Sequence, residues 1–265
     1  MKNLLNTAIH ASIAAGKEIM KVYNTSDFNV EIKDDNSPLT LADQKANAAI
    51  MEFLIHTEIP IISEENKLIS YNERKDWERC WIVDPLDGTK EFIKRNGEFT
   101  VNIALVENNK PIMGVIYIPV QQKLYFTNVS YDKAFQLVLS DLDMKAEAIL
   151  EMAKEIKPTE NADKMRIVGS RSHLNEETKS FIDAVETKKE IEVVSSGSSL
   201  KFCLVAEGAA DQYPRFAPTM EWDTAAGQAI CEAAGVSVID HNSNAPLLYN
   251  KENLLNPWFL VSNNL

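Results

Sequence analysis

The spacing of hydrophobic positions predicts two amphipathic helices near the start of the chain. Apolar residues recur every three or four positions in residues 4–23 and again in residues 46–54, as they do on the buried face of a helix. Between these segments, residues 28–32 alternate like a short strand. Thr40 is suited to cap the second helix, and Asp43 stands three residues later, as in a capping box. The pattern alone therefore gives Asp43 a structural role.

Short hydrophobic runs in the middle of the chain predict a β-sheet. Residues 59–62 and 80–83 are brief, apolar and partly β-branched, which is typical of buried strands. Three further β-rich segments follow at residues 100–107, 111–120 and 123–127, and short turns join them. We expect these segments to form an antiparallel meander.

A polar, proline-containing stretch at residues 158–163 is the expected domain boundary. Before it, residues 142–156 are expected to form a linking helix or an irregular connection. The chain then divides into an N-terminal α+β domain of residues 1–157 and a C-terminal α/β domain of residues 158–265.

The second half alternates between strands and helices. Residues 166–168 and 191–194 read as strands, and each ends in a Ser/Gly-rich turn that contains a basic residue. Such turns suit phosphate binding through backbone amides and hydroxyls, although Ser and Gly also form turns without any ligand. Further on, Asp223 is suited to be the N-cap of a helix that ends at Gly235.

Chemistry is concentrated where the strand at residues 80–83 ends. Pro85 is expected to stop this strand, because proline lacks a backbone donor, and a helix can begin near Gly88. Asp84 and Asp87 would then face one small volume beside the first amides of the helix, which suit an anion. Two carboxylates beside an anion site favour a divalent cation. This stretch alone favours the simpler alternative, an ordinary turn with Asp87 or Gly88 as a helix cap.

Composition and charge narrow the class of protein. The 265 residues include 27 Lys and Arg against 39 Asp and Glu, so the formal net charge is −12. This charge disfavours binding to a nucleic-acid polymer, but a bound metal ion can reverse the potential locally for a small anionic substrate.

Cysteine usage and hydropathy bear on the compartment. The three cysteines are far apart and predict neither a zinc site nor a disulfide framework, which favours a reducing compartment. No stretch has the length and apolar character of a membrane span. We therefore expect a cytoplasmic protein, with peripheral membrane association left open.

Three acidic motifs occur in order along the chain: Ser63-Glu64-Glu65, residues 84–89 and residues 221–227. Together they resemble the inositol monophosphatase superfamily of metal-dependent, lithium-sensitive phosphomonoesterases. The resemblance covers essentially the whole chain. It implies a layered α/β (α+β) sandwich of the sugar phosphatase type, with a mainly antiparallel N-terminal sheet and a smaller mixed α/β C-terminal part.

Three further segments, at residues 169–173, 197–203 and 213–227, look like the bacterial 3′(2′),5′-bisphosphate nucleotidase branch of this superfamily. Ala217 stands where this branch more often has glycine. The departure removes no functional group.

The resemblance also implies a metal site. The implied ligands of Mg²⁺, two or three ions per site, are Glu64, Asp84, the backbone carbonyl of Leu86, Asp87 and Asp223. Ligation by oxygen alone is what Mg²⁺ prefers. The resemblance further implies that Asp43 and Thr89 orient and deprotonate the attacking water.

The same resemblance assigns residues to the substrate. The amides of Gly88 and Thr89 would hold the phosphoryl oxygens. Ser172 and His173 would contact the nucleotide, and its other phosphate would be contacted by Ser199, Lys201 and Arg215. The residues expected to border the substrate are Glu64, Asp87, Gly88, Thr89, Ser172, His173, Ser199, Lys201, Arg215 and Asp223.

The expected activity is Mg²⁺-dependent removal of the 3′-phosphate from 3′-phosphoadenosine 5′-phosphate, which gives AMP and phosphate and clears a by-product of sulfate assimilation. The nearest alternative is an inositol or sugar monophosphatase on the same scaffold. A noncatalytic sensor of a nucleotide or metal is a remote alternative. The expected partner is a small nucleotide bisphosphate, and the oligomeric state is left open.

Overall fold

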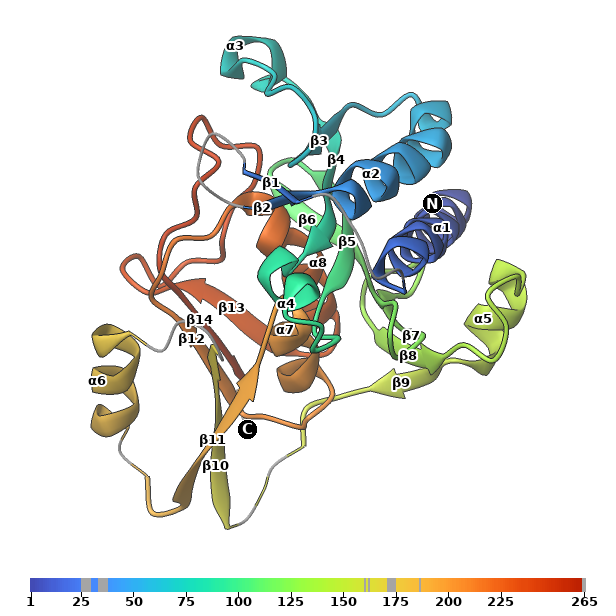
Figure 1. Ribbon diagram of the computed structural model, residues 1–265. Coiled ribbons are helices and arrows are strands. Elements are labelled where there is room, and N and C mark those ends of the chain that lie inside the picture. The colour runs from blue at the N-terminus through green and yellow to red at the C-terminus, as the bar shows by residue number, and fades with distance from the viewer. Residues whose placement is uncertain are drawn as a thin grey trace.

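The computed structural model describes residues 1–24, 30–32, 38–159, 161, 163–170, 175–185 and 187–263. Within them the chain builds layers of helices and sheets (Figure 1). A seven-stranded sheet stands beside a five-stranded sheet. The predicted layered α/β sandwich is confirmed.

The larger sheet is built from the first half of the chain. In spatial order its strands are β3 (Ile61–Ser63), β4 (Arg79–Asp87), β5 (Thr100–Glu107), β6 (Lys110–Ile118), β7 (Lys123–Thr127), β8 (Ala134–Val138) and β9 (Lys154–Ile156). β3 and β4 run parallel, and every following neighbour pair is antiparallel. The predicted meander is therefore correct.

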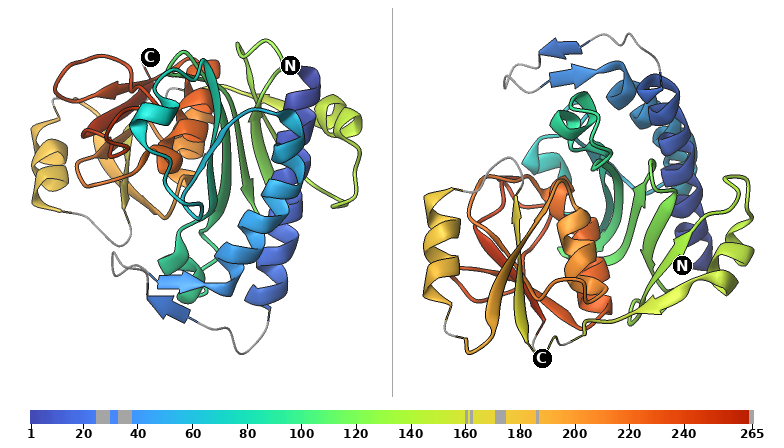
Figure 2. Two further views of the ribbon diagram at one scale, coloured as in Figure 1. Left: turned by 90° about the horizontal axis from the view of Figure 1, so that it is seen from above. Right: turned by 60° about the horizontal axis from the view of Figure 1, so that its bottom comes forward.

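Helices cover both faces of the larger sheet. The helical elements are α1 (Lys2–Tyr23), α2 (Leu41–Leu54), the 3₁₀ turn η1 (Ile55–Thr57), α3 (Tyr71–Arg74), α4 (Thr89–Ile93), α5 (Ala146–Met152), α6 (Glu176–Ala184), α7 (Leu200–Ala206) and α8 (Glu221–Ala233). α1 and α2 pack together on one face, and α8 packs on the other against β5 and β6 (Figure 2). The acidic end of β4 is thus enclosed between helices.

The smaller sheet belongs to the second half of the chain. In spatial order its strands are β11 (Glu190–Ser196), β10 (Lys164–Ser170), β12 (Gln212–Arg215), β14 (Phe259–Asn263) and β13 (Val236–Asp240). β10 runs parallel to both of its neighbours, and β14 runs antiparallel to both of its own. The mixed character predicted for this half is confirmed. A short antiparallel pair, β1 (Val30–Ile32) with β2 (Pro38–Thr40), stands apart from both sheets.

Two hydrophobic cores lie on opposite faces of the larger sheet. Along β4, Trp81 and Val83 belong to the core under α1 and α2, whereas Cys80 and Ile82 belong to the core under α7 and α8. This alternation follows from the two-residue period of a strand. The strand reads as an unbroken apolar run because both of its faces are buried. The second core also takes in residues of the smaller sheet, so the boundary at 158–163 stays a prediction.

Pro85 does not end the strand that contains it. β4 continues to Asp87, and its register against β5 shifts between Asp84 and Asp87. A bulge leaves a residue without a ladder partner, so a proline's missing donor costs little there. The prediction of a strand end at Pro85 was wrong, and the bulge turns the two carboxylates toward one side.

Two other local predictions also need correction. Met220, not Asp223, is the N-cap of α8, and Asp223 is the third residue of that helix. Residues 142–156 contain the expected helix, but they also supply β9 at the edge of the sheet. The strand at 28–32 is observed for Val30–Ile32, whereas residues 28 and 29 lie outside the described residues.

The cysteines and the helices agree with what the sequence suggested. Cys80, Cys203 and Cys231 are buried with free thiols. In the described part of the chain, no helix has the length and apolar character needed to cross a membrane.

Candidate active site

Three carboxylates from distant parts of the chain meet at the bulged end of β4. Asp84 and Asp87 come from this strand and Asp223 from the first turn of α8, and their carboxylate oxygens lie within 4.8 Å of one another. Local hydrogen bonds orient two of them. Asp84 Oδ1 accepts from the amide of Leu86 at 3.1 Å, and Asp223 Oδ2 accepts from the amide of Met220 at 2.8 Å.

The clustered negative charges of this triad favour binding of a cation. Burial raises the pKa of Asp84 well above its usual range, and the nearby charges of Glu64, Asp87, Asp223 and Asp43 raise it further. Burial, followed by the charge of Asp87, raises the pKa of Asp223 to about 7. Like charges gathered in a buried site repel one another unless positive charge is added. A donor set of carboxylate oxygens fits a hard divalent ion such as Mg²⁺ or Ca²⁺.

The other predicted metal ligands stand around the triad. The amide of Glu64 donates to the carbonyl of Val83 at 3.2 Å, which fixes this residue beside β4, and its charge acts on Asp84. Leu86 is buried, and its carbonyl accepts from Thr89 Oγ1 at 3.5 Å. The group that meets within 4.8 Å consists of Asp84, Asp87 and Asp223, so Glu64 and Leu86 stay predictions as ligands.

Both residues predicted to handle the attacking water lie near this group. Asp43 sits in the first turn of α2 and is fully buried, and its charge contributes to the raised pKa of Asp84. Thr89 is the first residue of α4 and is half-buried. The charge of Asp43 therefore acts on the Asp84 carboxylate. A residue that only stabilised the helix would not need to lie so close to the triad.

Gly88 allows the chain to turn from β4 into α4. Its φ is +94°, a left-handed conformation that side chains disfavour. A Cβ at this position would lie 3.1 Å from the carbonyl oxygen of Glu98, so space is also limited. The amide of Phe92 donates to the Gly88 carbonyl at 2.9 Å and closes the first turn of the helix. A glycine here lets the polypeptide backbone border the pocket directly.

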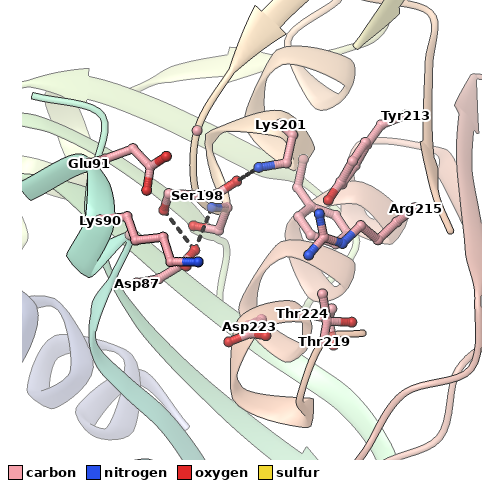
Figure 3. A pocket seen from close by; sticks show the side chains of 14 residues that line it. Asp87, Lys90, Glu91, Ser198, Lys201, Tyr213, Arg215, Thr219, Asp223 and Thr224 are labelled. Atoms are coloured by element: carbon pink, nitrogen blue, oxygen red, sulfur yellow. Dashed lines mark hydrogen bonds between the residues drawn. The ribbon is translucent and has the colours of Figure 1, made fainter. Parts of the chain in front are cut away.

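A pocket opens beside the triad between the two halves of the molecule (Figure 3). One wall comes from the β4–α4 junction, and the other comes from the turn before α7, from β12 and from α8. The lining residues are Asp87, Gly88, Lys90, Glu91, Gly197, Ser198, Ser199, Lys201, Phe202, Tyr213, Arg215, Thr219, Asp223 and Thr224. Lys201 and Arg215 thus stand across the pocket from Asp87 and Glu91, while Asp223 shares the wall of Lys201 and Arg215.

Lys201 and Arg215 supply the cationic side. Lys201 is 5% exposed, its Nζ donates to the carbonyl of Ser198, and the Nζ lies 5.4 Å from the centre of the Tyr213 ring. Burial lowers the pKa of Lys201 to about 8, an effect that Asp87 opposes and Arg215 supports. Arg215 donates through Nη2 to the carbonyl of Pro218 at 3.1 Å, while its buried Nε has no hydrogen-bond partner among the described residues. A buried ammonium beside a half-buried guanidinium suits an anionic ligand.

Ser199 ties the two halves together. Its amide donates to Asp87 Oδ2 at 2.6 Å, and Ser198 Oγ donates to the same oxygen at 2.7 Å. The hydroxyl of Ser199 is buried and lies 2.7 Å from both Asn102 Oδ1 and Thr100 Oγ1. The observed contacts of Ser199 are thus within the protein, and its proposed contact with a phosphate stays a prediction.

The structure adds residues that the sequence did not single out. Lys90, Ser198 and Tyr213 line the pocket without having been predicted to do so. A signal for Tyr213 existed, because positions 213 and 215 of one strand share a face. Ser172 and His173, predicted to contact the nucleotide, lie outside the described residues.

Comparisons with known proteins agree with this arrangement. A model of the inositol monophosphatase family matches residues 1–261. The 3′(2′),5′-bisphosphate nucleotidase CysQ of Escherichia coli K12 is 46% identical over 252 residues, which are 94% of this chain and 95% of the relative. CysQ of Haemophilus influenzae is 35% identical and covers 98% of this chain and 93% of its own.

Solved structures match as well. The crystal structure of CysQ from Bacteroides thetaiotaomicron, described as a bacterial member of the inositol monophosphatase family, has a TM-score of 0.87 and 50% identity, covering 98% of this chain and 96% of its own. An inositol monophosphatase from Anabaena has a TM-score of 0.71 and 25% identity, covering 99% and 91%. The cluster of carboxylates, the layered fold and these matches agree, and the chain belongs to the inositol monophosphatase family.

Proposed function

We propose that this protein is a 3′(2′),5′-bisphosphate nucleotidase, a metal-dependent phosphomonoesterase that hydrolyses the 3′-phosphate of 3′-phosphoadenosine 5′-phosphate. The observation that carries the proposal is one pocket that borders the carboxylate triad through Asp87 and Asp223 and is also lined by Lys201 and Arg215. The first group suits a metal-assisted reaction at one phosphate, and the second suits a further phosphate. The activity for which the CysQ relatives are named supports the same reaction.

The reaction transfers a phosphoryl group to water. A water oxygen attacks phosphorus, the bond between phosphorus and the 3′-oxygen breaks, and the leaving oxygen takes a proton, which yields AMP and inorganic phosphate. Two or three Mg²⁺ ions would supply positive charge at the attacking and leaving oxygens. In our proposal the residues that hold them are Glu64, Asp84, the carbonyl of Leu86, Asp87 and Asp223.

Residues of the N-terminal half handle the water and the reacting phosphate. Asp43 is fully buried beside the triad, and we assign it to accept the proton of the attacking water, with Thr89 orienting that water. The amides of Gly88 and Thr89, at the start of α4, are assigned to the phosphoryl oxygens. The burial of Asp43 and its charge effect on Asp84 support the first assignment, and the position of Gly88 and Thr89 at the start of α4 supports the second.

Residues of the C-terminal half select the substrate. A buried ammonium and a guanidinium bind a dianionic phosphate through charge-assisted hydrogen bonds, which are stronger than neutral ones. We assign Lys201 and Arg215 to the 5′-phosphate, with Ser199 as the residue that fixes the turn between them and Asp87. Ser172 and His173 remain candidates for contacts with the nucleoside.

The cellular role follows from the reaction. Hydrolysis of 3′-phosphoadenosine 5′-phosphate would clear a by-product of sulfate assimilation, as inferred from the resemblance to the CysQ relatives. Three buried free thiols suit a reducing compartment, so we propose the cytoplasm as the site of action.

The proposal is tested by phosphate release from a panel of substrates. We expect the purified protein to release phosphate from 3′-phosphoadenosine 5′-phosphate with Mg²⁺, to stop when EDTA removes the metal, and to leave 5′-AMP as the product on chromatography. Equal rates with inositol 1-phosphate would favour the monophosphatase alternative. Tight nucleotide binding without phosphate release would favour the sensor.

A further inference from the structure

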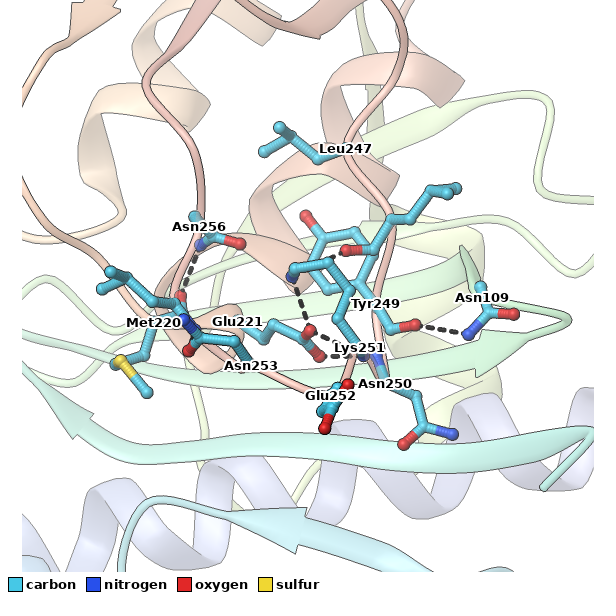
Figure 4. A network of polar contacts seen from close by, with 12 residues as sticks. Asn109, Met220, Glu221, Leu247, Tyr249, Asn250, Lys251, Glu252, Asn253 and Asn256 are labelled. Carbon is cyan, nitrogen blue, oxygen red and sulfur yellow. Dashed lines mark hydrogen bonds and ion pairs between the residues drawn. The ribbon is translucent and has the colours of Figure 1, made fainter. Parts of the chain in front are cut away.

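A loop near the C-terminal end of the sequence contacts both the helix that carries Asp223 and the segment that leads into β4. This loop, residues 249–256, contacts the first turn of α8, which carries Asp223 (Figure 4). It also contacts the segment of residues 64–79, which links Glu64 to β4. We call it the bridging loop. Its contacts on both sides are buried and polar.

Glu221 attaches the bridging loop to α8. Its side chain is 0% exposed. Oε2 accepts from the amide of Asn250 at 2.6 Å, and Oε1 accepts from the amide of Lys251 at 3.0 Å and from Lys251 Nζ at 2.6 Å. The amide of Glu221 donates back to the carbonyl of Leu254 at 3.0 Å. A buried carboxylate is tolerated only with such partners. These hydrogen bonds therefore fix the position of the loop relative to the N-terminus of α8.

Asn256 connects the loop to the Asp223 carboxylate through one intermediate residue. Its Nδ2 donates to the carbonyl of Met220 at 2.7 Å and to Thr224 Oγ1 at 3.0 Å. The amide of Met220 in turn donates to Asp223 Oδ2 at 2.8 Å. With Met220 fixed at its carbonyl by Asn256 and at its amide by Asp223, the orientation of the carboxylate depends on the loop.

Arg74 attaches the loop on its other side. This side chain is 3% exposed; Nη1 donates to Asn250 Oδ1 at 2.8 Å, and Nη2 donates to the carbonyl of Glu252 at 2.9 Å. Asn250 Nδ2 returns a bond to the Arg74 carbonyl at 2.8 Å. Arg74 ends α3, within the segment that joins Glu64 to β4. The loop therefore spans from the helix that carries Asp223 to the segment that leads into β4.

We propose that the bridging loop positions Asp223 against Asp84 and Asp87, with Glu221 and Asn256 as positioning residues; the inference rests on the proposed function only in taking these three carboxylates as metal ligands. The carboxylates repel one another before a metal binds. Asp223 is far from Asp84 and Asp87 in the sequence, so local backbone geometry does not fix its position relative to them. Other contacts must therefore hold Asp223 in place. Groups that orient ligands in this way typically change metal affinity tenfold to a hundredfold when they are mutated.

The test measures Mg²⁺ binding directly, by isothermal titration calorimetry without substrate. Glu221→Gln keeps the side-chain volume but sets an amide against the donors of residues 250 and 251, and Asn256→Ala removes the bond to Met220. We expect both variants to bind Mg²⁺ about tenfold or more weakly. At saturating Mg²⁺, the KM for 3′-phosphoadenosine 5′-phosphate should stay within twofold of the wild-type value, because Lys201 and Arg215 are untouched.

Controls separate positioning from simple loss of stability. Ile19 is fully buried in α1, away from the site, and Ile19→Val and Ile19→Ala lower stability by different amounts. A control with the same metal-free melting temperature as Glu221→Gln should keep wild-type Mg²⁺ affinity. Lys251→Met removes the bonds of the partly exposed Nζ to Glu221 and to the carbonyl of Leu248 but keeps the backbone bonds to Glu221. It is the variant to use if Glu221→Gln does not fold, and we expect a smaller loss of Mg²⁺ affinity.

The inference is overturned if every folded variant binds Mg²⁺ like the wild type, or if the stability-matched control loses as much affinity. Mg²⁺ binding is measured without turnover, so its outcome does not depend on which substrate the enzyme prefers. If the protein binds Mg²⁺ but hydrolyses another substrate, the proposed activity is wrong, and the binding test of the bridging loop still applies.

Discussion

At the scale of single residues, the charge of Lys201 depends strongly on its surroundings. It is almost completely buried, and burial lowers its pKa to about 8. The ammonium therefore predominates below pH 8 in the ligand-free site, and the neutral amine predominates above it. A dianionic phosphate is attracted only by the charged form.

This predicts a pH dependence that belongs to the second phosphate. The kcat/KM for 3′-phosphoadenosine 5′-phosphate should fall as the pH rises through about 8, since this ratio reports the ionisation of the free enzyme. Lys201→Arg should abolish the fall, because guanidinium stays charged. The internal control is 3′-AMP, which lacks the 5′-phosphate. An equal fall with 3′-AMP, or with the arginine variant, would assign the pH dependence to another group.

Individual residues also show how much of the site could be predicted from the sequence. Asp84 and Asp87 were predictable as a pair because they lie three residues apart in the sequence. Their meeting with Asp223 could be predicted only from the motif resemblance, since nothing local joins Asp223 to them. Tyr213 and Ser198 were missed because their role depends on which segments pack together. The contact of Ser198 with Asp87 spans 111 residues of chain, a distance over which periodicity carries no information.

At the scale of elements, the strand boundaries predicted from hydrophobic runs were close, and the error at Pro85 has a physical reason. Proline is costly in a strand only where its missing donor is needed. The shift in register between Asp84 and Asp87 removes that need, and register depends on pairing with β5, which lies later in the chain. Similarly, β9 was missed because an edge strand of three residues depends on its neighbour β8.

The packing of α8 on the larger sheet determines where Asp223 lies. Gly114 of β6 determines how closely α8 approaches the sheet. A Cβ at Gly114 would lie 2.3 Å from the carbonyl oxygen of Ala226 in α8. We expect Gly114→Ala to move α8 outward, to lower the free energy of unfolding by about 1–3 kcal/mol and to reduce kcat together with Mg²⁺ affinity. Chemical denaturation and steady-state kinetics measure both effects.

A matched glycine provides the control. Gly235 has a φ of +86°, and no atom lies within 4 Å of the position that a Cβ would take there, so Gly235→Ala adds backbone strain without a clash at the sheet. It should cost about 1–2 kcal/mol of stability and leave kcat unchanged. If Gly114→Ala lowers stability but keeps the wild-type kcat, α8 does not transmit its position to the active site.

At the scale of the whole molecule, the two halves supply different parts of one reaction. The larger sheet contributes Asp84 and Asp87, and the C-terminal half contributes Lys201, Arg215 and the remaining carboxylate, Asp223. A shared hydrophobic core and the contacts of the 197–199 turn hold the halves together. The fold class was predictable because it follows from the order of elements and from the resemblance. The pocket was not, since it forms where the two halves meet.

We propose that the carboxylates of both halves hold the metal ions for hydrolysis and that Lys201 and Arg215 select a second phosphate. The most direct test is the ratio of kcat/KM for 3′-phosphoadenosine 5′-phosphate to that for 3′-AMP, measured in the wild type and in Lys201→Ala with Mg²⁺. We predict that the substitution lowers this ratio by about tenfold to a hundredfold, the value of a hydrogen bond to a charged group, and leaves 3′-AMP hydrolysis nearly unchanged. Equal losses with both substrates would contradict the account.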